Sequence, residues 1–313
     1  MIPVIIIQGA TASGKSSFAI ELAKALESEI ISADSRQVYR KLDIGTAKVS
    51  SAEQAQVKHH LIDVVDPDEN YNAGRFVSDA SELIFYLHAQ GKIPIIAGGT
   101  GMYVKALLEG LINIPEADEQ IKQQLRQLAH EKTGAEIKQI LAKVDPLSAQ
   151  RIETNDVQKL LRALEVWEIT GKSITTHYQE QQEQKIFQPY RILLEMDRKI
   201  LYDRINRRID IMINNGLLKE IDNLLRAGYK ENDPGLIAVG YREFYPWFRG
   251  EQTLEESIRL AKKHSRNYAK RQLTWFRRID YDLTLSPEKI NICDVKQKIL
   301  NWKKMIRSKN DSC

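Results

Sequence analysis

The stretch that decides the fold is Gly9-Ala10-Thr11-Ala12-Ser13-Gly14-Lys15-Ser16, or GATASGKS. It fits the pattern G-x-x-x-x-G-K-[ST], a P-loop whose backbone N–H groups wrap around phosphate oxygens, as in many ATP- and other nucleotide-binding proteins. An apolar run at residues 4–8 precedes it and a helical pattern at 15–27 follows, which is the strand–turn–helix setting that the motif requires. That setting disfavours a chance match in an ordinary tight turn. We therefore predict a polyphosphate site, in which Lys15 supplies positive charge and Ser16 offers its hydroxyl to Mg²⁺.

Strand and helix patterns alternate along the rest of the chain. Short strands are predicted at residues 29–32, 60–64, 93–97 and 190–195, with an amphipathic helix at 73–90. This alternation predicts an α/β fold: a P-loop NTPase-like, mostly parallel sheet flanked by helices. After the last of these strands the sequence reads as almost entirely helical.

A long polar stretch separates the fourth strand from the fifth. It is rich in Gln, Glu, Lys and Arg and has almost no strand pattern. We therefore predict a core domain in two parts, residues 1–115 and 190–313, with a helical insertion domain at 116–189 between them.

The charge of the chain is concentrated in one place. The formal net charge is +4, but residues 258–278 hold five Arg, three Lys and no acid, which is +8 and leaves −4 for the rest. A solvated helix face usually mixes both signs, so a single-sign run favours a polyanionic partner such as nucleic acid.

The remaining composition predicts a cytoplasmic protein. With 42% hydrophobic residues the chain can bury a proper core, and no apolar run is long enough to span a membrane. Its two cysteines, Cys293 and Cys313, form no disulfide framework, which is typical of a reducing compartment. The adjacent His59 and His60 would point to opposite faces of a strand, so we interpret them as core or hydrogen-bonding residues and not as metal ligands.

The residues that follow the second strand form another candidate group. Asp34 lies in the stretch ADSRQVY, at the carboxyl edge of the sheet that also carries the P-loop. There Asp34 is placed to act as a base or hydrogen-bond acceptor near the phosphates, but it is equally suited to cap a helix. Position alone leaves both interpretations open.

The fourth strand ends in Gly98-Gly99-Thr100-Gly101 and carries no acid. P-loop ATPases and GTPases hold Mg²⁺ with an Asp at the end of another strand. Asp63, in the third strand, is not followed by a glycine in a switch-like pattern. We therefore expect a site that holds a diphosphate without hydrolysing a nucleotide.

Several motifs taken together narrow the function. They occur in this order: GATASGKS, ADSRQVYRKLDIGTAK, HHLIDVVDP, AGGTGMYVKAL, NDVQKLLRALEVWEITGK, RINRRIDIMINNGLLKEI, VGYRE and KRQLTWFRR. Over residues 3–280 the chain strongly resembles the bacterial tRNA dimethylallyltransferase family. The resemblance implies transfer of a dimethylallyl group from dimethylallyl diphosphate to the N6 amine of the adenine next to the anticodon on its 3′ side.

The resemblance also implies roles for individual residues. The loop from Gly9 to Ser16 would grip the diphosphate, with Thr11 near its bridging oxygen. Arg208 of RRIDIM would neutralise the leaving diphosphate, and Asp34 would bind the adenine N6 amine and take its proton. Thr11, Asp34 and Arg208 are thus the expected catalytic residues, with Mg²⁺ as cofactor.

The same resemblance implies a tRNA surface that contacts the anticodon stem-loop. Nothing in the sequence suggests an obligate interface with another copy, so we expect a monomer. The basic run ending in Gln272 matches a tRNA-contacting segment, and Lys122 and Lys159 depart from the pattern where an Arg is expected. The expected contacts are Asp34, Ser35, Arg36, Gln37, Thr100, Lys122, Gln158, Lys159, Leu160, Leu161, Arg162, Lys270 and Arg271.

Three other functions compete with this one. A P-loop small-molecule kinase would transfer a phosphoryl group, but the missing strand-end acid counts against it. A prenyltransferase acting on free adenylate would need neither the insertion nor the basic run. A pure RNA-binding module would not need a P-loop.

Overall fold

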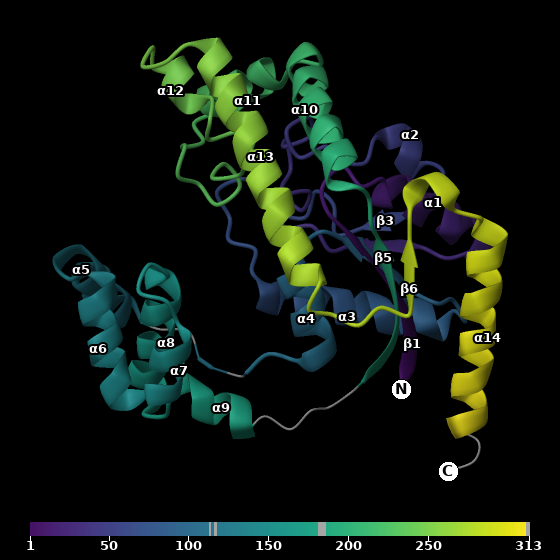
Figure 1. The fold of residues 1–313 in the computed structure, drawn as a ribbon, viewed down its shortest axis with the longest axis horizontal. Helices are drawn as coiled ribbons and strands as arrows, with labels where there is room; N and C mark the ends of the chain where they lie inside the picture. The colour runs from purple at the N-terminus through teal and green to yellow at the C-terminus, as the bar shows by residue number, and fades with distance from the viewer. Residues whose placement is uncertain (113, 116–117, 181–185, 311–313) are drawn as a thin grey trace. The chain divides into compact units, whose positions relative to one another are not determined.

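The computed structural model describes residues 1–112, 114–115, 118–180 and 186–310 (Figure 1). Its contacts divide the chain into two compact units, one of Met1–Glu109 with Lys185–Cys313 and one of Gly110–Gln184. The second unit therefore starts and ends a few residues before the predicted insertion at 116–189. One reason is that residues 187–189, including Pro189, already belong to a strand, in which Pro189 pairs with Val4.

The first unit is built on a six-stranded parallel sheet, as predicted. Its strands run in the order β3-β2-β4-β1-β5-β6, and every pairing is parallel. The central β1 pairs with β4 on one side and β5 on the other, which explains why its Ile-rich sequence is buried on both faces. The strands are β1 (Ile2–Gly9), β2 (Ile30–Ser32), β3 (His59–His60), β4 (Ile95–Gly98), β5 (Phe187–Leu194) and β6 (Leu283–Leu285).

Two strand predictions need correction. The third strand was expected at 60–64, but β3 is only His59–His60, because Leu61 and Asp63 take positive φ angles of 60° and 56° that no strand allows. The edge strand β6 was not predicted, since three residues between helices give almost no periodic pattern. His60 contacts Glu29 through Nε2 at 2.7 Å, in agreement with a hydrogen-bonding role.

Helices cover both faces of the sheet. On one face α1 (Lys15–Leu26) and α14 (Ile292–Asn310), next to each other in Figure 1, pack on Ile5 and Ile7 of β1. On the other face Val4 and Ile6 pack with a larger helical layer. That layer comprises α3 (Ala73–Ala89), α4 (Gly101–Glu109), α10 (Arg198–Asn214), α11 (Leu217–Arg226) and α13 (Leu254–Phe276). The short helices of this unit are α2 (Ser51–Gln54), α12 (Tyr245–Phe248) and the 3₁₀ turn Pro287–Lys289.

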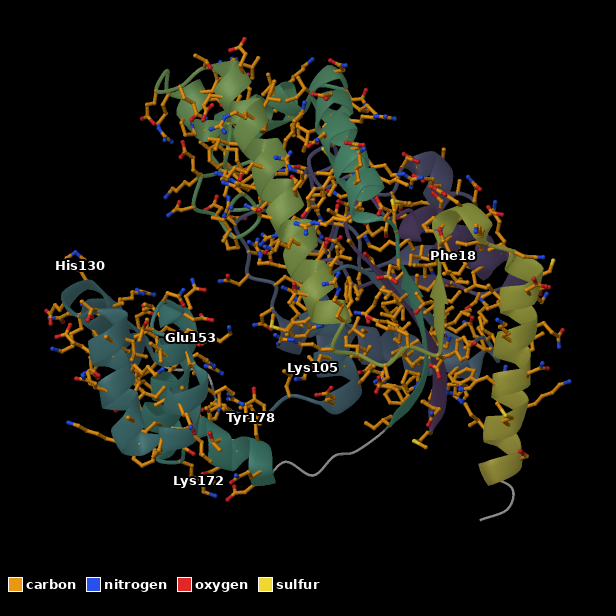
Figure 2. All side chains as sticks on the ribbon, in the orientation of Figure 1. Phe18, Lys105, His130, Glu153, Lys172 and Tyr178 are labelled. Atoms are coloured by element: carbon orange, nitrogen blue, oxygen red, sulfur yellow. The ribbon has the colours of Figure 1, made fainter. Side chains whose placement is uncertain are left out.

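The second unit is a helical bundle with its own small core. Buried Asp145 caps α7 and also accepts hydrogen bonds from Thr175, which ties α7 to α9. Its surface is polar, and Figure 2 labels four of its exposed side chains, including Tyr178 at 54% exposure. Its helices are α5 (Glu119–Glu131), α6 (Gly134–Val144), α7 (Pro146–Arg151), α8 (Val157–Thr170) and α9 (Ile174–Glu180). The core residues are Ile137, Leu141, Ala149, Ile152, Leu160, Ala163 and Leu164.

Among the described residues, no helix is both long enough and apolar enough to cross a membrane.

Candidate active site

The P-loop leaves the start of α1 open to a ligand. Gly14 is the N-cap of α1, with φ 88° and ψ 10°, and no side chain caps the first turn. The N–H groups at this end of the helix are therefore free to bind an anion. Gly9 is required by close packing, because a Cβ there would lie 2.6 Å from Ser13 Oγ.

Two cations meet in front of this loop. Lys15 and Arg208, from α10, line the same cavity of about 340 Å³, together with Gly14 and Ser16. Burial lowers the pKa of the Lys15 ammonium to about 8, although Asp34 acts in the opposite direction, and burial also lowers the pKa of Arg208. Within the described residues, neither cation has an ion-pair partner within 4.0 Å. Two desolvated, unpaired positive charges at a helix start make a site for a dianionic or trianionic group.

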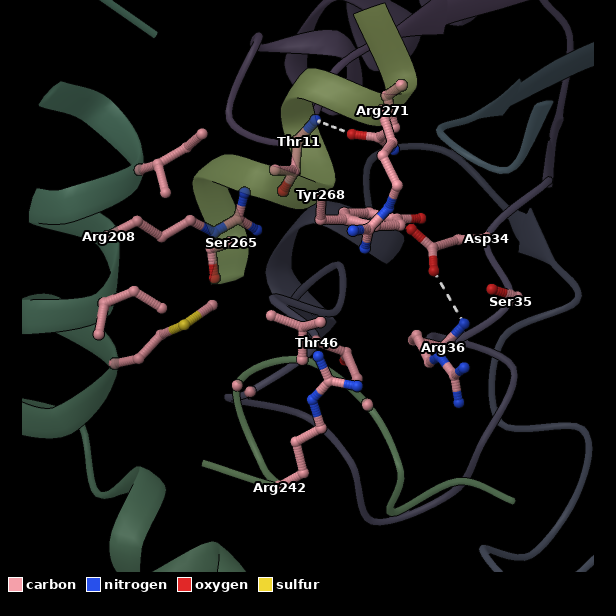
Figure 3. Close-up of a pocket in the computed structure, with 18 of the residues that line it drawn as sticks. Thr11, Asp34, Ser35, Arg36, Thr46, Arg208, Arg242, Ser265, Tyr268 and Arg271 are labelled. Carbon is pink, nitrogen blue, oxygen red and sulfur yellow. Dashed lines mark hydrogen bonds between the residues drawn. The ribbon is translucent and has the colours of Figure 1, made fainter. Parts of the chain in front are cut away.

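A second cavity, of about 280 Å³, adjoins the first. Thr11, Lys15, Asp34, Thr46 and Arg208 line both. Figure 3 shows Asp34 and Arg208 reaching into this pocket from opposite sides. Its remaining wall is partly apolar, with α10 contributing Ile205, Ile209 and Met212. The two cavities together therefore offer a charged end for phosphates and a mixed apolar–polar end for a second group.

Asp34 is positioned for both of the roles that the sequence left open. Its Oδ1 accepts hydrogen bonds from the backbone N–H groups of Arg36 (2.9 Å) and Gln37 (3.3 Å), which caps the turn after β2. The carboxylate nevertheless faces both cavities. The cap thus fixes the orientation of the carboxylate and leaves Oδ2 without a hydrogen-bond partner among the described residues.

Thr100 and Gln37 support this turn. Thr100 Oγ1 accepts a hydrogen bond from the Ser35 N–H at 3.1 Å, so the loop after β4 holds the loop after β2. Gln37 is 8% exposed, and its amide donates to the carbonyl of Ala47. Arg36 donates to the carbonyl of Pro234. In this conformation these side chains hold protein loops together.

Thr46 lines both cavities, although no sequence pattern singled it out. The loop before it is held by Glu220 of α11, whose carboxylate accepts hydrogen bonds from the backbone N–H groups of residues 43–45 at 2.7–3.1 Å. Tyr241 donates to the same carboxylate at 2.6 Å. Glu220 therefore fixes, from a distant part of the chain, a loop that lines both cavities.

Helix α13 contributes further residues that the sequence reasoning missed. Tyr268 and Ser265 line the second cavity, and burial, with Asp34 adding to it, raises the pKa of the Tyr268 hydroxyl to about 12. Arg242 lines the cavity from the loop before α12. Arg242 lies inside VGYRE, a motif that carried the family resemblance without a role for this residue.

The basic run on α13 is less one-sided in space than in sequence. Arg259 pairs with Glu256 and Lys262 with Asp210 of α10, each at 2.6 Å. Some of the +8 charge is therefore neutralised by neighbours on the same unit. Within the part of the chain that the structure describes, no ion pair is found for Lys263, Lys270, Arg271, Arg277 and Arg278.

The predicted tRNA residues of the insertion lie in the second unit. Lys122 is within 4.0 Å of Glu119, Lys159 pairs with Asp156, and Arg162 pairs with Glu165 at 2.5 Å. Gln158 is exposed on α8, the helix that also carries Lys159 and Arg162. Leu160 is completely buried in the core of this unit and Leu161 packs against that core, so both hold the helix.

Comparison with known proteins identifies the family. The family model described as IPP transferase matches residues 37–279, and a model described as isopentenyl transferase matches residues 2–68. The chain belongs to the IPP transferase family. It is 41% identical over 285 residues to a tRNA dimethylallyltransferase of Thermoanaerobacter sp. (strain X514), covering 90% of each chain. It is 45% identical over 279 residues to the tRNA dimethylallyltransferase of Carboxydothermus hydrogenoformans, covering 88% and 89%.

Solved structures of IPP transferases share the fold. The full-length tRNA isopentenylpyrophosphate transferase of Bacillus halodurans is 36% identical, with a TM-score of 0.73 and 100% of both chains covered. The tRNA isopentenylpyrophosphate transferase of Staphylococcus epidermidis is 37% identical, with a TM-score of 0.70 over 97% and 99% of the chains. A eukaryotic dimethylallyltransferase acting on tRNA is 29% identical, with a TM-score of 0.80 over 92% of this chain and 75% of that one.

Proposed function

We propose that this protein transfers a dimethylallyl group from dimethylallyl diphosphate to the N6 amine of the adenine 3′-adjacent to the anticodon of tRNA. The observation that carries the proposal is the pair of adjoining cavities that share Lys15 and Arg208 on one side and Asp34 on the other. A leaving diphosphate fits the cationic side, and an attacking amine fits the carboxylate side. Membership of the IPP transferase family supports the same reaction.

The reaction is a substitution at the allylic carbon. The bond from this carbon to the diphosphate oxygen breaks, and its electron pair stays on the diphosphate. Lys15, Arg208 and the N–H groups at the start of α1 place positive charge where this negative charge develops, which stabilises the transition state. In this proposal the Thr11 hydroxyl lies near the bridging oxygen.

On the acceptor side a new bond joins the adenine N6 to the allylic carbon. An aryl amine is weakly basic, so loss of its proton during attack lowers the barrier. We propose that the Asp34 carboxylate accepts that proton. Its turn-capping hydrogen bonds fix the carboxylate in place before substrate arrives.

We propose Mg²⁺ as the cofactor, where it would neutralise part of the diphosphate charge. Ser16, which lines the cationic cavity, would supply a hydroxyl ligand. No group of three or more His, Cys, Asp or Glu residues suited to a metal ion is found among the described residues. The residues thus fit an ion that takes most of its ligands from the diphosphate and water, as Mg²⁺ commonly does.

The proposed acceptor is an anticodon stem-loop. A stacked base must leave its loop to reach a pocket of this kind, and unpaired loops are the usual targets of sequence-specific RNA recognition. Lys270, Arg271 and the exposed cations of the second unit are the proposed phosphate contacts. The monomeric state and the cytoplasmic location stay predictions.

A P-loop kinase is disfavoured by the other acid at this edge. Asp63 is engaged by Lys48, whose ammonium lies 2.5 Å from its carboxylate and 2.6 Å from that of Asp43. The Lys48 side chain is only 5% exposed, so this contact is a fixed part of the loop. Asp63 Oδ1 is therefore held by Lys48, which counts against Asp63 as the strand-end ligand that a P-loop kinase would offer to Mg²⁺.

One assay tests the function against its rivals. The protein is incubated with dimethylallyl diphosphate and tRNA, AMP or ATP, and the products are analysed for prenylated adenine. Among the three acceptors, we expect prenylated product only with tRNA. We expect Lys15→Met to lower the transfer rate by roughly a hundredfold or more, because a preorganised charge is lost. Product with AMP or ATP, or an unchanged rate in Lys15→Met, would contradict the proposal.

A further inference from the structure

Gln272 of α13 bridges two loops of the site with one amide group. The backbone N–H of Thr11 donates to Gln272 Oε1 at 2.9 Å, and Gln272 Nε2 donates to the carbonyl of Gly99 at 2.9 Å (Figure 3 draws the first of these bonds). The side chain is 7% exposed and lines the second cavity. The family resemblance implies that Gln272 ends a tRNA-contacting run, but its amide faces the P-loop.

The first bond fixes Thr11 on the donor side. Because Gln272 engages the N–H of Thr11, that N–H is not available to a phosphate. Thr11 lines both cavities, and its backbone is held by the hydrogen bond to Gln272 of α13. Gln272 thereby sets the orientation in which Thr11 meets the donor.

The second bond leads to the acceptor side. Gly99 is followed by Thr100, whose hydroxyl oxygen accepts from the N–H of Ser35. Ser35 is bonded directly to Asp34 and lies within the turn that Asp34 caps. A continuous path of hydrogen bonds and peptide bonds therefore joins Thr11 to Asp34, and Gln272 is its central link.

Each residue of the double glycine has its own reason to lack a side chain. A Cβ on Gly99 would lie 2.4 Å from Gln272 Nε2, so any side chain there would push the amide away. A Cβ on Gly98 would lie 2.0 Å from the backbone oxygen of Ala33, which cannot move aside as easily. Gly99 thus serves the bridge, whereas Gly98 serves the packing of the two loops.

We propose that Gln272 is a positioning residue that fixes Thr11 and the Asp34 turn relative to each other, and so aligns the donor with the acceptor amine. This inference rests on the proposed prenyl transfer. It assigns to α13, the helix proposed to contact tRNA, a direct hold on the donor loop.

A positioning role has a distinct kinetic consequence. Each substrate keeps its own binding contacts when the bridge is lost, so the affinities for donor and tRNA change little. The reacting atoms, however, are no longer held in line, and a misplacement of about 1 Å can cost roughly a hundredfold in rate. The rate constant at saturation should therefore fall without a matching change in either dissociation constant.

The test is a single-turnover experiment on Gln272→Met, which keeps the side-chain length and removes both bonds. We expect the transfer rate constant at saturating donor and tRNA to fall about 30- to 100-fold, with each dissociation constant within about threefold of wild type. Ser28→Ala is the matched control, because buried Ser28 donates to the carbonyl of Ile93 just before β4, away from the carboxyl edge. It should lower the melting temperature and leave the rate within about twofold.

Gly99→Ala provides an independent way to break the same bridge. Gly99 does not need a positive φ, so alanine is tolerated there except for the contact with the amide. We expect Gly99→Ala to reproduce the rate loss of Gln272→Met, and the double variant to be no slower than the slower single variant, because both remove one interaction.

Several results would overturn the inference. They are a rate in Gln272→Met within threefold of wild type, a loss that is explained by weaker donor binding, or losses that multiply in the double variant. Wild-type turnover is measured in the same series. Failure of the wild-type protein to prenylate tRNA would count against the proposed function, whereas an unaffected Gln272→Met in an active series would count against the bridge alone.

Discussion

The polar contacts that shape the pocket of the sheet unit span far more of the sequence than the ion pairs of α8 in the Gly110–Gln184 unit. In the sheet unit the contacts that shape the pocket join residues far apart in sequence: Gln272 bonds Thr11 across 261 residues, and Glu220 bonds the loop at 43–45 across 175 to 177. In the Gly110–Gln184 unit the cations Lys159 and Arg162 pair with acids three residues away, one at the N-cap of α8 and one within α8.

This difference separates two tasks. Long-range bonds fix a geometry that only the complete fold can produce, which suits a site where atoms must be aligned for reaction. Exposed pairs between neighbours on a helix are worth little and can be exchanged for phosphate oxygens at small cost. In the proposed function, the paired cations of the second unit therefore remain available to phosphate groups, while the sheet unit performs the chemistry.

The largest expected effect comes from Asp34→Asn. Asn caps a turn about as well as Asp but does not readily take a proton, so the melting temperature should hardly change while the rate falls by roughly 10²–10⁴-fold. Single-turnover prenylation and thermal unfolding measure the two quantities separately. Near-wild-type turnover would show that the residue is only a cap.

The next effect is expected from Glu220→Gln, which tests the long-range hold on the loop before Thr46. The amide would turn an NH₂ group toward backbone N–H donors, so we expect a rate loss of about tenfold together with a lower melting temperature. Glu136→Gln, at the local cap of α6 in the second unit, is the control. If it slows transfer as much as Glu220→Gln, the distinction between the two units fails.

A pH series examines the buried charge of the donor site. Lys15, with its pKa near 8, is protonated below that pH and loses its charge above it. Donor affinity should therefore fall as the pH rises, by about tenfold between pH 7 and pH 9 if the bound complex keeps the proton. Titration calorimetry with dimethylallyl diphosphate measures this change. Lys15→Arg should flatten the profile, and an equally steep profile in that variant would assign the dependence to another group.

The smallest expected effects are on tRNA binding, when cations of the two units are replaced in separate variants. Lys270 and Arg271 have no ion pair among the described residues, so replacing both with Gln should reduce the salt slope of tRNA binding by about 1.5. Replacing Lys159 and Arg162 should reduce it less, because each already neutralises a neighbouring acid. Filter binding over a range of salt concentrations measures both, and a larger change in the second pair would reverse this ranking.

Sequence patterns predicted the features that depend on residues close together in the chain. The P-loop, the parallel sheet and the position of Asp34 at its edge follow from motifs and periodicity within a few residues. Glu220 and the amide of Gln272 could not be found this way, since their partners lie more than 170 residues away. Likewise the basic run on α13 looked unpaired because Asp210, which neutralises Lys262, belongs to another helix.

Because the start of α1 is uncapped, a bound donor would raise the stability of the folded protein. Gly14 is the N-cap, and no side chain accepts a hydrogen bond from the first turn, so bound diphosphate would supply the cap that the chain lacks. A ligand that binds only the folded state adds about 2.7 kcal/mol at a hundred times its dissociation constant. The supply of isoprenoid diphosphate would then influence how long each molecule survives proteolysis as well as how fast it works.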